Sequence, residues 1–172
     1  MSGSTEWRTP PEFFARLHAE SGFNVDAAAT PESALVIPKI GRCNHRPWNM
    51  AHGRYYTAES DGTKPEHYGP GDRVFCNPPY SPAALVYHFV QTAAMTSREQ
   101  GALWVMLLNS TCCDTRWFHD FIWDAELHRP RGRVELRLLR KRLTFLRPDG
   151  TPAGAPRHGN MLAVFRPPLV AK

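Results

Sequence analysis

The tetrapeptide Asn-Pro-Pro-Tyr at residues 77–80 has the residue types and order that could hold a planar amine in place. It follows the apolar run at residues 74–76, which is typical of a strand. Proline cannot donate to a sheet ladder and fixes its own φ, so the strand must end here. The residue before each proline is also pushed into an extended conformation. The sequence therefore predicts a stiff loop at the carboxyl end of a strand.

This loop carries two hydrogen-bond acceptors beside an aromatic ring. Asn77 supplies a side-chain carbonyl, Pro78 a main-chain carbonyl, Pro79 stiffness and Tyr80 the ring. The exocyclic amine of adenine is a poor nucleophile, because its lone pair is delocalised into the ring. Two acceptors on its N–H bonds favour a pyramidal nitrogen that can attack a sulfonium methyl, so positioning and electrostatics replace a general base. Tyr80 would stack on a base that has left the duplex. The alternative is a proline-stiffened turn with an ordinary interfacial tyrosine.

The composition is that of a globular protein with one domain. The chain has 172 residues, of which 42% are hydrophobic and 22% charged. It has no run of about 18 apolar residues and no apolar region typical of a signal peptide, so we expect a cytoplasmic protein without a membrane span. Cys43, His45 and His52 fit no zinc spacing, so no metal site is expected.

The net charge of +5 is concentrated in residues 129–142, where Glu135 is the one acid. Such a cluster indicates a contact surface for a polyanion. Val134, Leu136 and Leu138 alternate with charged residues, which predicts a strand with one buried and one charged face. The alternative is a solvated strand whose arginine stems cover apolar surface. The basic residues are Arg129, Arg131, Arg133, Arg137, Arg140, Lys141 and Arg142.

Helix signals occur at three places. Thr9 fits an N-cap with Glu12 as its capping-box partner, and Ser21-Gly22 ends that helix. A second helix begins at residues 81–82 and runs to about residue 94, and a third begins after Asp114. Strands are expected at residues 23–26, 74–76, 102–108, 125–128, 134–138, 143–146 and 161–165.

The order of these elements argues for an α/β sheet, partly parallel, with an antiparallel hairpin at its edge. Ligands bind beyond the carboxyl ends of the strands in such sheets. Asp26 and Asn77 both fall at the carboxyl ends of expected strands, so one edge could hold a methyl donor and its acceptor together. Residues 38–72 show no sustained periodicity, which inside a compact domain is typical of a functional or mobile segment.

Short motifs follow one another along most of the chain. They are Thr9-Pro10 with Phe13-Phe14, Asp26-Ala27-Ala28, Tyr55-Tyr56-Thr57 with Asp61-Gly62, Cys76-Asn77-Pro78-Pro79-Tyr80-Ser81, residues 105–108, residues 114–119, Arg131-Gly132-Arg133 and residues 161–165. This order resembles the phage-type DNA N6-adenine methyltransferases (Dam-like). The resemblance implies a Rossmann-like methyltransferase fold over residues 1–172, with S-adenosylmethionine as cofactor. It further implies double-stranded DNA with a flipped adenine as substrate, and a phage- or prophage-encoded enzyme in the host cytoplasm.

The resemblance also assigns a cofactor site. Thr9 and Pro10 would lie near the methionine end of the cofactor, where a helix N-terminus receives a carboxylate. Asp26 would meet the methionine ammonium, with Ala27 and Ala28 forming the loop around it.

Asp61 would read the cofactor's adenine amine, with Glu59 as the second choice and a plain turn residue as the alternative. The expected catalytic residues are Asn77, Pro78, Pro79 and Tyr80, while Trp117 and Phe118 form either a second wall for the base or part of the core. The expected DNA contacts are Ser81, Arg131, Arg133, Arg137, Arg140, Lys141 and Arg142.

Two departures keep other functions open. Ala27-Ala28-Ala29 stands where many methyltransferases have glycines, and residues 33–58 offer no clear acid for the ribose hydroxyls. A non-catalytic DNA-binding protein on a methyltransferase scaffold is therefore one alternative. Methylation of cytosine N4, RNA or a protein glutamine is another, because each uses the same acceptor geometry. The target sequence would be read by the loop at residues 38–72 or by the basic hairpin at residues 129–165.

Overall fold

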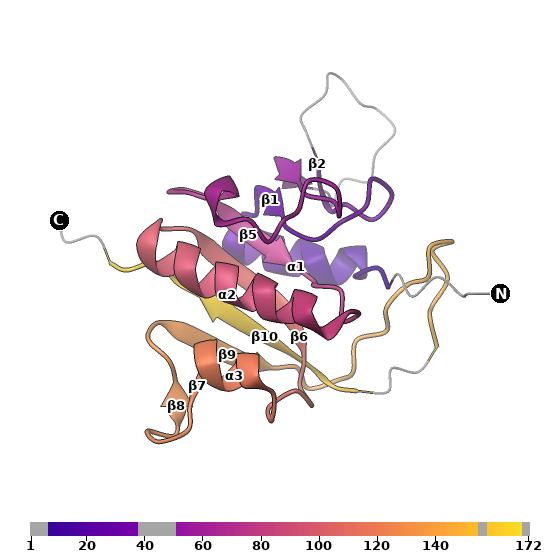
Figure 1. Cartoon of the computed structure of the whole chain (residues 1–172). Helices are drawn as coiled ribbons and strands as arrows, with labels where there is room; N and C mark the ends of the chain where they lie inside the picture. Colours follow the sequence, from indigo (N-terminus) through magenta and orange to yellow (C-terminus); the bar gives the residue numbers. More distant parts are fainter. Residues whose placement is uncertain (1–6, 38–50, 155–157, 170–172) are drawn as a thin grey trace.

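The computed structural model describes residues 7–37, 51–154 and 158–169 (Figure 1). Three α-helices lie within them, α1 (Pro11–Ser21), α2 (Ala83–Glu99) and α3 (Arg116–Phe121), with the 3-10 turn η1 (Pro65–His67). The strands of the main sheet are β1 (Val25–Asp26), β4 (Arg54–Tyr55), β5 (Arg73–Cys76), β6 (Leu103–Asn109), β9 (Val134–Leu138) and β10 (Asn160–Phe165). The strands β2 (Val36–Ile37) and β3 (Ala51–His52) form one small pair, and β7 (Trp123–Asp124) and β8 (Arg129–Pro130) form another.

The main sheet has the strand order β4-β1-β5-β6-β10-β9. The first four strands pair in parallel. β10 is antiparallel to both β6 and β9, so β9 points the same way as the first four. The predicted α/β sheet, partly parallel with an antiparallel hairpin, is therefore confirmed. Its parallel strands share one carboxyl edge, the right-hand edge in Figure 1, and one amino edge.

Helices cover both faces of this sheet (Figure 1). On one face Phe13, Phe14 and Leu17 of α1 pack in a core cluster with Phe75 of β5 and Val105 of β6. On the other face α2 and α3 pack against the opposite side chains of the same strands. Because β5, β6 and β10 are covered on both faces, their sequences are continuous apolar runs, as expected for buried parallel sheets.

The capping box predicted at the start of α1 is wrong. Pro10 is the N-cap, and no side chain caps this helix. Two adjacent prolines explain this, because neither has an N–H that needs a partner. The predicted end of the helix is confirmed, since Gly22 is left-handed with φ 64° and its N–H donates to the His18 carbonyl.

Two predicted strands are absent from the described residues. At residues 125–128 the chain turns instead, because Oδ1 of Asp124 accepts the N–H groups of Glu126 and Leu127. At residues 143–146 there are only isolated bridges, from Leu146 to Arg8 and to Pro152. The first strand was wrongly predicted because a local side-chain contact forms a turn there, and the second because isolated long-range bridges replace a continuous ladder.

Helix boundaries and the irregular segment also differ from prediction. α2 continues to Glu99, because Thr96 in its last turn is fully buried and accepts a hydrogen bond from the Trp104 indole. The N-cap of α3 is Thr115 rather than Asp114. Within residues 38–72, β3, β4 and η1 are regular, while residues 38–50 lie outside the described part of the chain. No described helix has the length and apolar character needed to cross a membrane.

A glycine holds the segment after β4 against β1. A Cβ atom placed on Gly62 would lie 1.9 Å from the carbonyl oxygen of Ala27 and 3.1 Å from Cβ of Tyr56. Both neighbours are fixed, Ala27 by its backbone hydrogen bond to Phe75 and Tyr56 by its bond to Asp26. Only glycine therefore allows this approach.

We predict that Gly62→Ala lowers the free energy of unfolding by about 1–3 kcal/mol, because the methyl group forces the segment away from β1. Urea denaturation measures the change. Gly69→Ala is the control, since a Cβ there meets nothing within 4 Å. If both variants unfold at the same urea concentration, the contact between Gly62 and Ala27 does not hold the segment.

Candidate active site

The loop at residues 77–80 leaves the carboxyl end of β5, between β1 and β6 in the sheet. Pro78 is buried, Asn77 is half-buried, and Pro79 and Tyr80 are exposed. The strand ends at Cys76, where prolines make further ladder bonds impossible. The strand predicted at residues 74–76, and its end before Asn77, are therefore confirmed.

No described residue competes for the side-chain oxygen of Asn77. Its Nδ2 donates to the carbonyl of Trp7 over 3.5 Å, a long hydrogen bond. Among the described residues, no group donates to Oδ1 of Asn77 or to the Pro78 carbonyl. Because the amide nitrogen faces Trp7, the oxygen is left as the acceptor for another molecule.

Tyr80 is held at its hydroxyl and open at its ring. The hydroxyl accepts a 2.6 Å hydrogen bond from the backbone N–H of Asn109, the last residue of β6. Burial around the hydroxyl raises the pKa of Tyr80. The residue as a whole is 42% exposed, while its hydroxyl is held at the end of β6.

Asp26 is a buried carboxylate at the end of β1. It is 3% exposed, and its oxygens accept the backbone N–H groups of Leu35 at 3.1 Å and Ala28 at 3.4 Å. Burial raises its pKa to about 6, although both hydrogen bonds act in the opposite direction. No cationic side chain pairs with it among the described residues. A cation bound here would remove the cost of its isolated charge.

Asp61 lies after β4, at the same edge of the sheet. Its φ is 53°, and its Oδ1 accepts both the N–H and the hydroxyl of Thr63. The bond from the Thr63 hydroxyl lowers the pKa of Asp61. One carboxylate oxygen thus shapes a turn, as the alternative expected, and no described residue donates a hydrogen bond to the other. Glu59 is exposed and accepts the Thr57 hydroxyl.

Residues 7–10, which precede α1, approach this edge of the sheet. Two of them, Trp7 and Arg8, were not predicted from the sequence. Thr9 is buried and Pro10 half-buried, next to the start of α1. Arg8 pairs with Leu146 through two backbone bonds, and its Nε is buried with no hydrogen-bond partner among the described residues. Trp7 contacts Asn77 as described above. Trp7 and Arg8 lie at or next to the backbone pairing of Arg8 with Leu146, a contact between distant residues that leaves no signal in a local sequence pattern.

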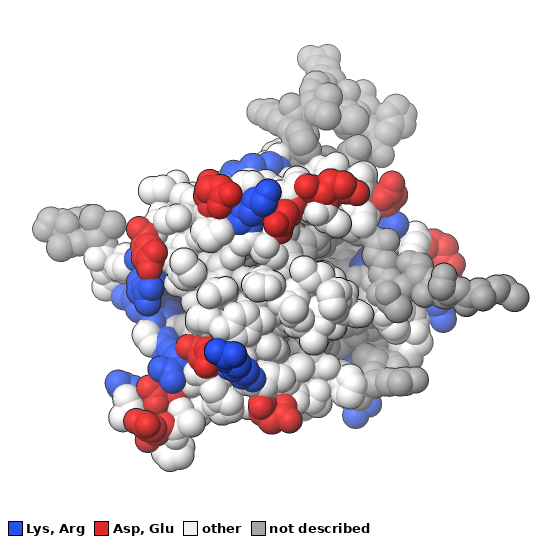
Figure 2. All heavy atoms as spheres, in the orientation of Figure 1, with Lys and Arg blue, Asp and Glu red and all other residues white. Residues whose placement is uncertain are grey.

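The basic residues grouped in the sequence separate in the structure. Arg131 and Arg133 precede β9 at the amino edge, whereas residues 140–142 follow it at the carboxyl edge, near Asn160. The five residues of β9 set these groups apart by about 16 Å. Figure 2 shows charged side chains around the rim of the face covered by α2 and few at its centre.

Arg137 itself is engaged in a surface ion-pair network. It binds Glu20 and Glu135 at 2.6 Å each, and Arg166 binds the same Glu135. These two arginines lower the pKa of Glu135 to about 2. The predicted buried face of β9 is only half right, because Val134 and Leu136 are partly buried while Leu138 is 76% exposed at the end of this edge strand.

Two aromatic residues do not reach this site. Trp117 and Phe118 are 7% and 5% exposed and belong to the core beneath α2. Their burial favours a role in the core over a role as a second wall for the base. Ser81 is exposed immediately after Tyr80. Of the three residues considered as metal ligands, Cys43 and His45 lie outside the described residues.

We predict that Tyr80→Phe loosens the end of β6, because the Asn109 N–H loses its acceptor. The loss of one such hydrogen bond, about 0.5–1.5 kcal/mol, raises amide exchange at Asn109 about three- to tenfold. NMR hydrogen exchange measures this directly. Tyr87→Phe is the control, since the Tyr87 hydroxyl contacts Asp120 instead. Unchanged protection of Asn109 in Tyr80→Phe would show that the tether is absent in solution.

Comparison with known proteins agrees with the motif order. The model of the family described as DNA N-6-adenine-methyltransferase (Dam) matches residues 2–167, nearly the whole chain. No curated protein and no solved structure matches the chain. The resemblance inferred from the residues is confirmed by the family match. The chain belongs to the DNA N-6-adenine-methyltransferase (Dam) family.

Proposed function

We propose that this protein transfers a methyl group from S-adenosylmethionine to the exocyclic N6 of adenine in DNA. The observation that carries the proposal is the open pair of acceptors at Asn77 and Pro78, next to the exposed ring of Tyr80. Membership of the Dam family supports the choice of adenine and DNA. We also propose that residues 1–172 form one domain with a Rossmann-like methyltransferase sheet.

The strand order supports a cofactor site at the carboxyl edge. The chain passes from β1 to β4 on one side of β1, and β5 then pairs on the other side. Ligands bind beyond the carboxyl ends of the strands at such a switch point. Asp26 is the last residue of β1, Asp61 comes after β4, and Asn77 comes directly after β5, so the three belong to neighbouring strands of the sheet.

The residues at this edge fit the amino-acid part of S-adenosylmethionine. Within the part of the chain that the structure describes, Asp26 is a buried anion without a cationic partner, and the buried Nε of Arg8 has no acceptor. An ammonium and a carboxylate would complement them, so the site suits a zwitterion. Thr9, Pro10, Ala27 and Ala28 would surround it, and the free oxygen of Asp61 would accept the amine of the cofactor's adenine. The bound cofactor supplies the electrophilic methyl group.

The loop at residues 77–80 orients the attacking amine. Oδ1 of Asn77 and the Pro78 carbonyl each accept one N–H of the extruded adenine, which directs the nitrogen lone pair along a defined line. Pro79 limits movement of the two carbonyls. The Tyr80 ring stacks on the base and offsets part of the cost of flipping it. The Trp7 carbonyl keeps the Asn77 amide turned with its oxygen toward the substrate.

Duplex DNA would lie along the carboxyl edge. Arg140, Lys141 and Arg142 lie on this side and are proposed phosphate contacts, together with Ser81. Arg137 stabilises the fold through its carboxylate partners, so its contribution to DNA binding is secondary. Arg131 and Arg133 face a different part of the molecule.

We predict that Asn77→Ala abolishes methylation, with a loss of at least about 100-fold, because one acceptor of the transferring amine is gone. The measurement is mass spectrometry of nucleosides from DNA of expressing cells. Asn77→Asp is the matched control, since its carboxylate keeps an acceptor and should keep measurable N6-methyladenine. N4-methylcytosine in place of N6-methyladenine would contradict the proposed base.

We predict that affinity for S-adenosylmethionine falls as the pH drops through about 6, the pKa of Asp26. Above that pH Asp26 is ionised and attracts the ammonium; below it the carboxyl is neutral, so binding weakens by up to about tenfold per pH unit. Calorimetric titration between pH 5 and 7.5 measures the step. Asp26→Asn should bind weakly without a step. A wild-type affinity that is flat across this range would exclude Asp26 from the cofactor site.

A further inference from the structure

Two of the large hydrophobic residues that the described chain exposes are aromatic, Trp7 and Tyr80, with exposed fractions of 51% and 42%. Both lie at Asn77. Tyr80 belongs to the same loop, and the carbonyl of Trp7 accepts the hydrogen bond from the Asn77 amide. The proposed function uses the carbonyl of Trp7 but gives its indole ring no role.

Trp7 is held in place by two contacts with the segment after β9. Its neighbour Arg8 pairs with Leu146 through two backbone hydrogen bonds of 2.9 Å each. The rings of Trp7 and Phe145 meet edge to face, with 6.4 Å between their centroids. Phe145 is half-buried and packs against the core cluster that contains Phe14. An exposed residue is therefore fixed by a partner that belongs to the core.

The chemistry of this indole suits a nucleic acid base. Among the described residues, no group accepts a hydrogen bond from the indole N–H of Trp7. An indole combines a flat apolar ring with one hydrogen-bond donor. A base offers a flat face for stacking and, in thymine, carbonyl oxygens that accept hydrogen bonds.

Trp7 lies between the loop at residues 77–80 and the basic residues proposed to contact the DNA backbone. Phe145, its ring partner, closely follows residues 140–142 in the chain, which leave β9 at the carboxyl edge. Figure 1 shows the described start of the chain and this orange segment on the same side of the sheet. DNA that reaches from the basic residues to Asn77 therefore passes Trp7.

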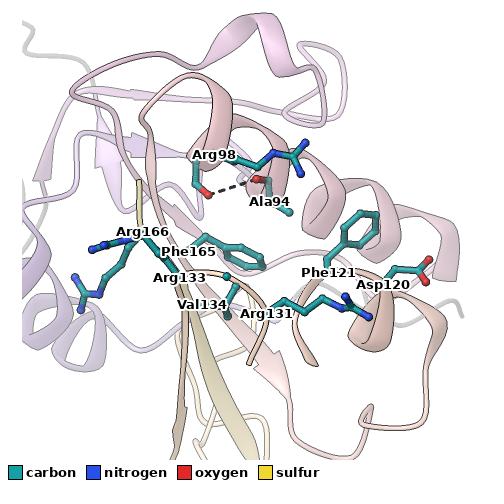
Figure 3. A pocket seen from close by; sticks show the side chains of 11 residues that line it. Ala94, Arg98, Asp120, Phe121, Arg131, Arg133, Val134, Phe165 and Arg166 are labelled. Carbon is teal, nitrogen blue, oxygen red and sulfur yellow. Dashed lines mark hydrogen bonds between the residues drawn. The ribbon is translucent and has the colours of Figure 1, made fainter. Parts of the chain in front are cut away.

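The opposite edge of the sheet has no such arrangement. A hollow of about 390 Å³ there is lined by Phe121, Val134 and Phe165, with arginines at its rim (Figure 3). Phe165 is buried and Phe121 half-buried, and the guanidinium groups of Arg133 and Arg166 extend away from both rings. The two exposed aromatic residues thus distinguish the carboxyl edge.

The side of Asn77 that Trp7 contacts indicates which base its ring meets. The Trp7 carbonyl lies at the nitrogen of the Asn77 amide, whereas the amine of the extruded adenine binds at the oxygen in the proposed function. Tyr80 stacks on that adenine. Its departure leaves a gap in the duplex opposite an unpaired thymine, and an apolar ring inserted between bases restores part of the lost stacking.

On the basis of the proposed adenine methylation, we propose that the indole of Trp7 enters this gap. There it stacks on the neighbouring bases and donates its N–H to a carbonyl oxygen of the unpaired thymine. Trp7 would thereby stabilise the duplex from which the adenine has left, and Tyr80 the adenine itself.

The direct test is ultraviolet cross-linking of the full chain, with S-adenosylhomocysteine, to plasmid DNA in which 5-bromouracil replaces thymine. The base opposite an extruded adenine is then always 5-bromouracil, which couples on irradiation to an aromatic residue that it contacts. Mass spectrometry of the digested complex identifies that residue. We expect the cross-link at Trp7, because Tyr80 faces the unmodified adenine.

The second measurement is the KM for unmodified plasmid DNA in the methylation reaction. Trp7→Ala removes the ring but keeps the carbonyl that holds Asn77, and should raise the KM about five- to 150-fold, the effect of losing one stack of a base on an aromatic ring. Trp7→Phe should keep most of the affinity. Leu127→Ala is the control, since Leu127 is an exposed apolar residue between β7 and β8, and its KM should equal that of the wild type. Circular dichroism checks that the three variants are folded.

A cross-link at Trp7 together with a raised KM of Trp7→Ala supports the proposal. Adenine methylation without a cross-link at Trp7, or with an unchanged KM of Trp7→Ala, would overturn it and leave the proposed function intact. A cross-link at Trp7 without any N6-methyladenine would contradict the proposed function and support the contact with DNA. If neither a cross-link nor methylation is found, both are wrong.

Discussion

The parallel register between β1 and β5 determines where the candidate functional groups lie. Val25 pairs with Val74 and Asp26 with Phe75, so the chain leaves both strands at the same height. Asp26 and Asn77 must then lie at one edge, whatever the loops do. β4 adds Asp61 to the same edge through its pairing with β1, and β6 adds the N–H that holds Tyr80. A shift of one residue would turn Asp26 to the other face of the sheet and separate these groups.

Burial gives this edge its electrostatic character. Asp26 is held by two backbone N–H groups yet keeps a raised pKa, because desolvation outweighs both bonds. Such a group is most stable when a ligand brings the missing positive charge. Asn77 and Tyr80 are different, because both are neutral side chains held by hydrogen bonds. The carbonyl of Trp7 holds the Asn77 amide, and the N–H of Asn109 holds the Tyr80 hydroxyl. We therefore propose that this edge combines a buried carboxylate that would bind a cation with a rigid neutral surface for a planar amine.

The sequence allowed prediction of what depends on local chemistry. The end of β5 at the prolines, the apolar face of α1 and the buried strand β6 all follow from residue types and spacing. The pairing of Arg8 with Leu146 could not be predicted, because the two residues are 138 positions apart and lie in segments without a periodic pattern. The grouping of Arg131 with Arg140 by sequence was misleading for a physical reason: a strand carries its two ends to opposite edges of the sheet.

The proposed activity requires a methyl donor at the carboxyl edge, with its sulfur facing Asn77. A crystal structure with S-adenosylhomocysteine tests this most directly. We expect the ammonium of the ligand beside Asp26, its carboxylate near Arg8 and Thr9, and its sulfur on the side of Asn77 and Tyr80. A ligand found away from the carboxyl edge of the sheet, or a loop at residues 77–80 turned away from the ligand, would contradict the proposed activity.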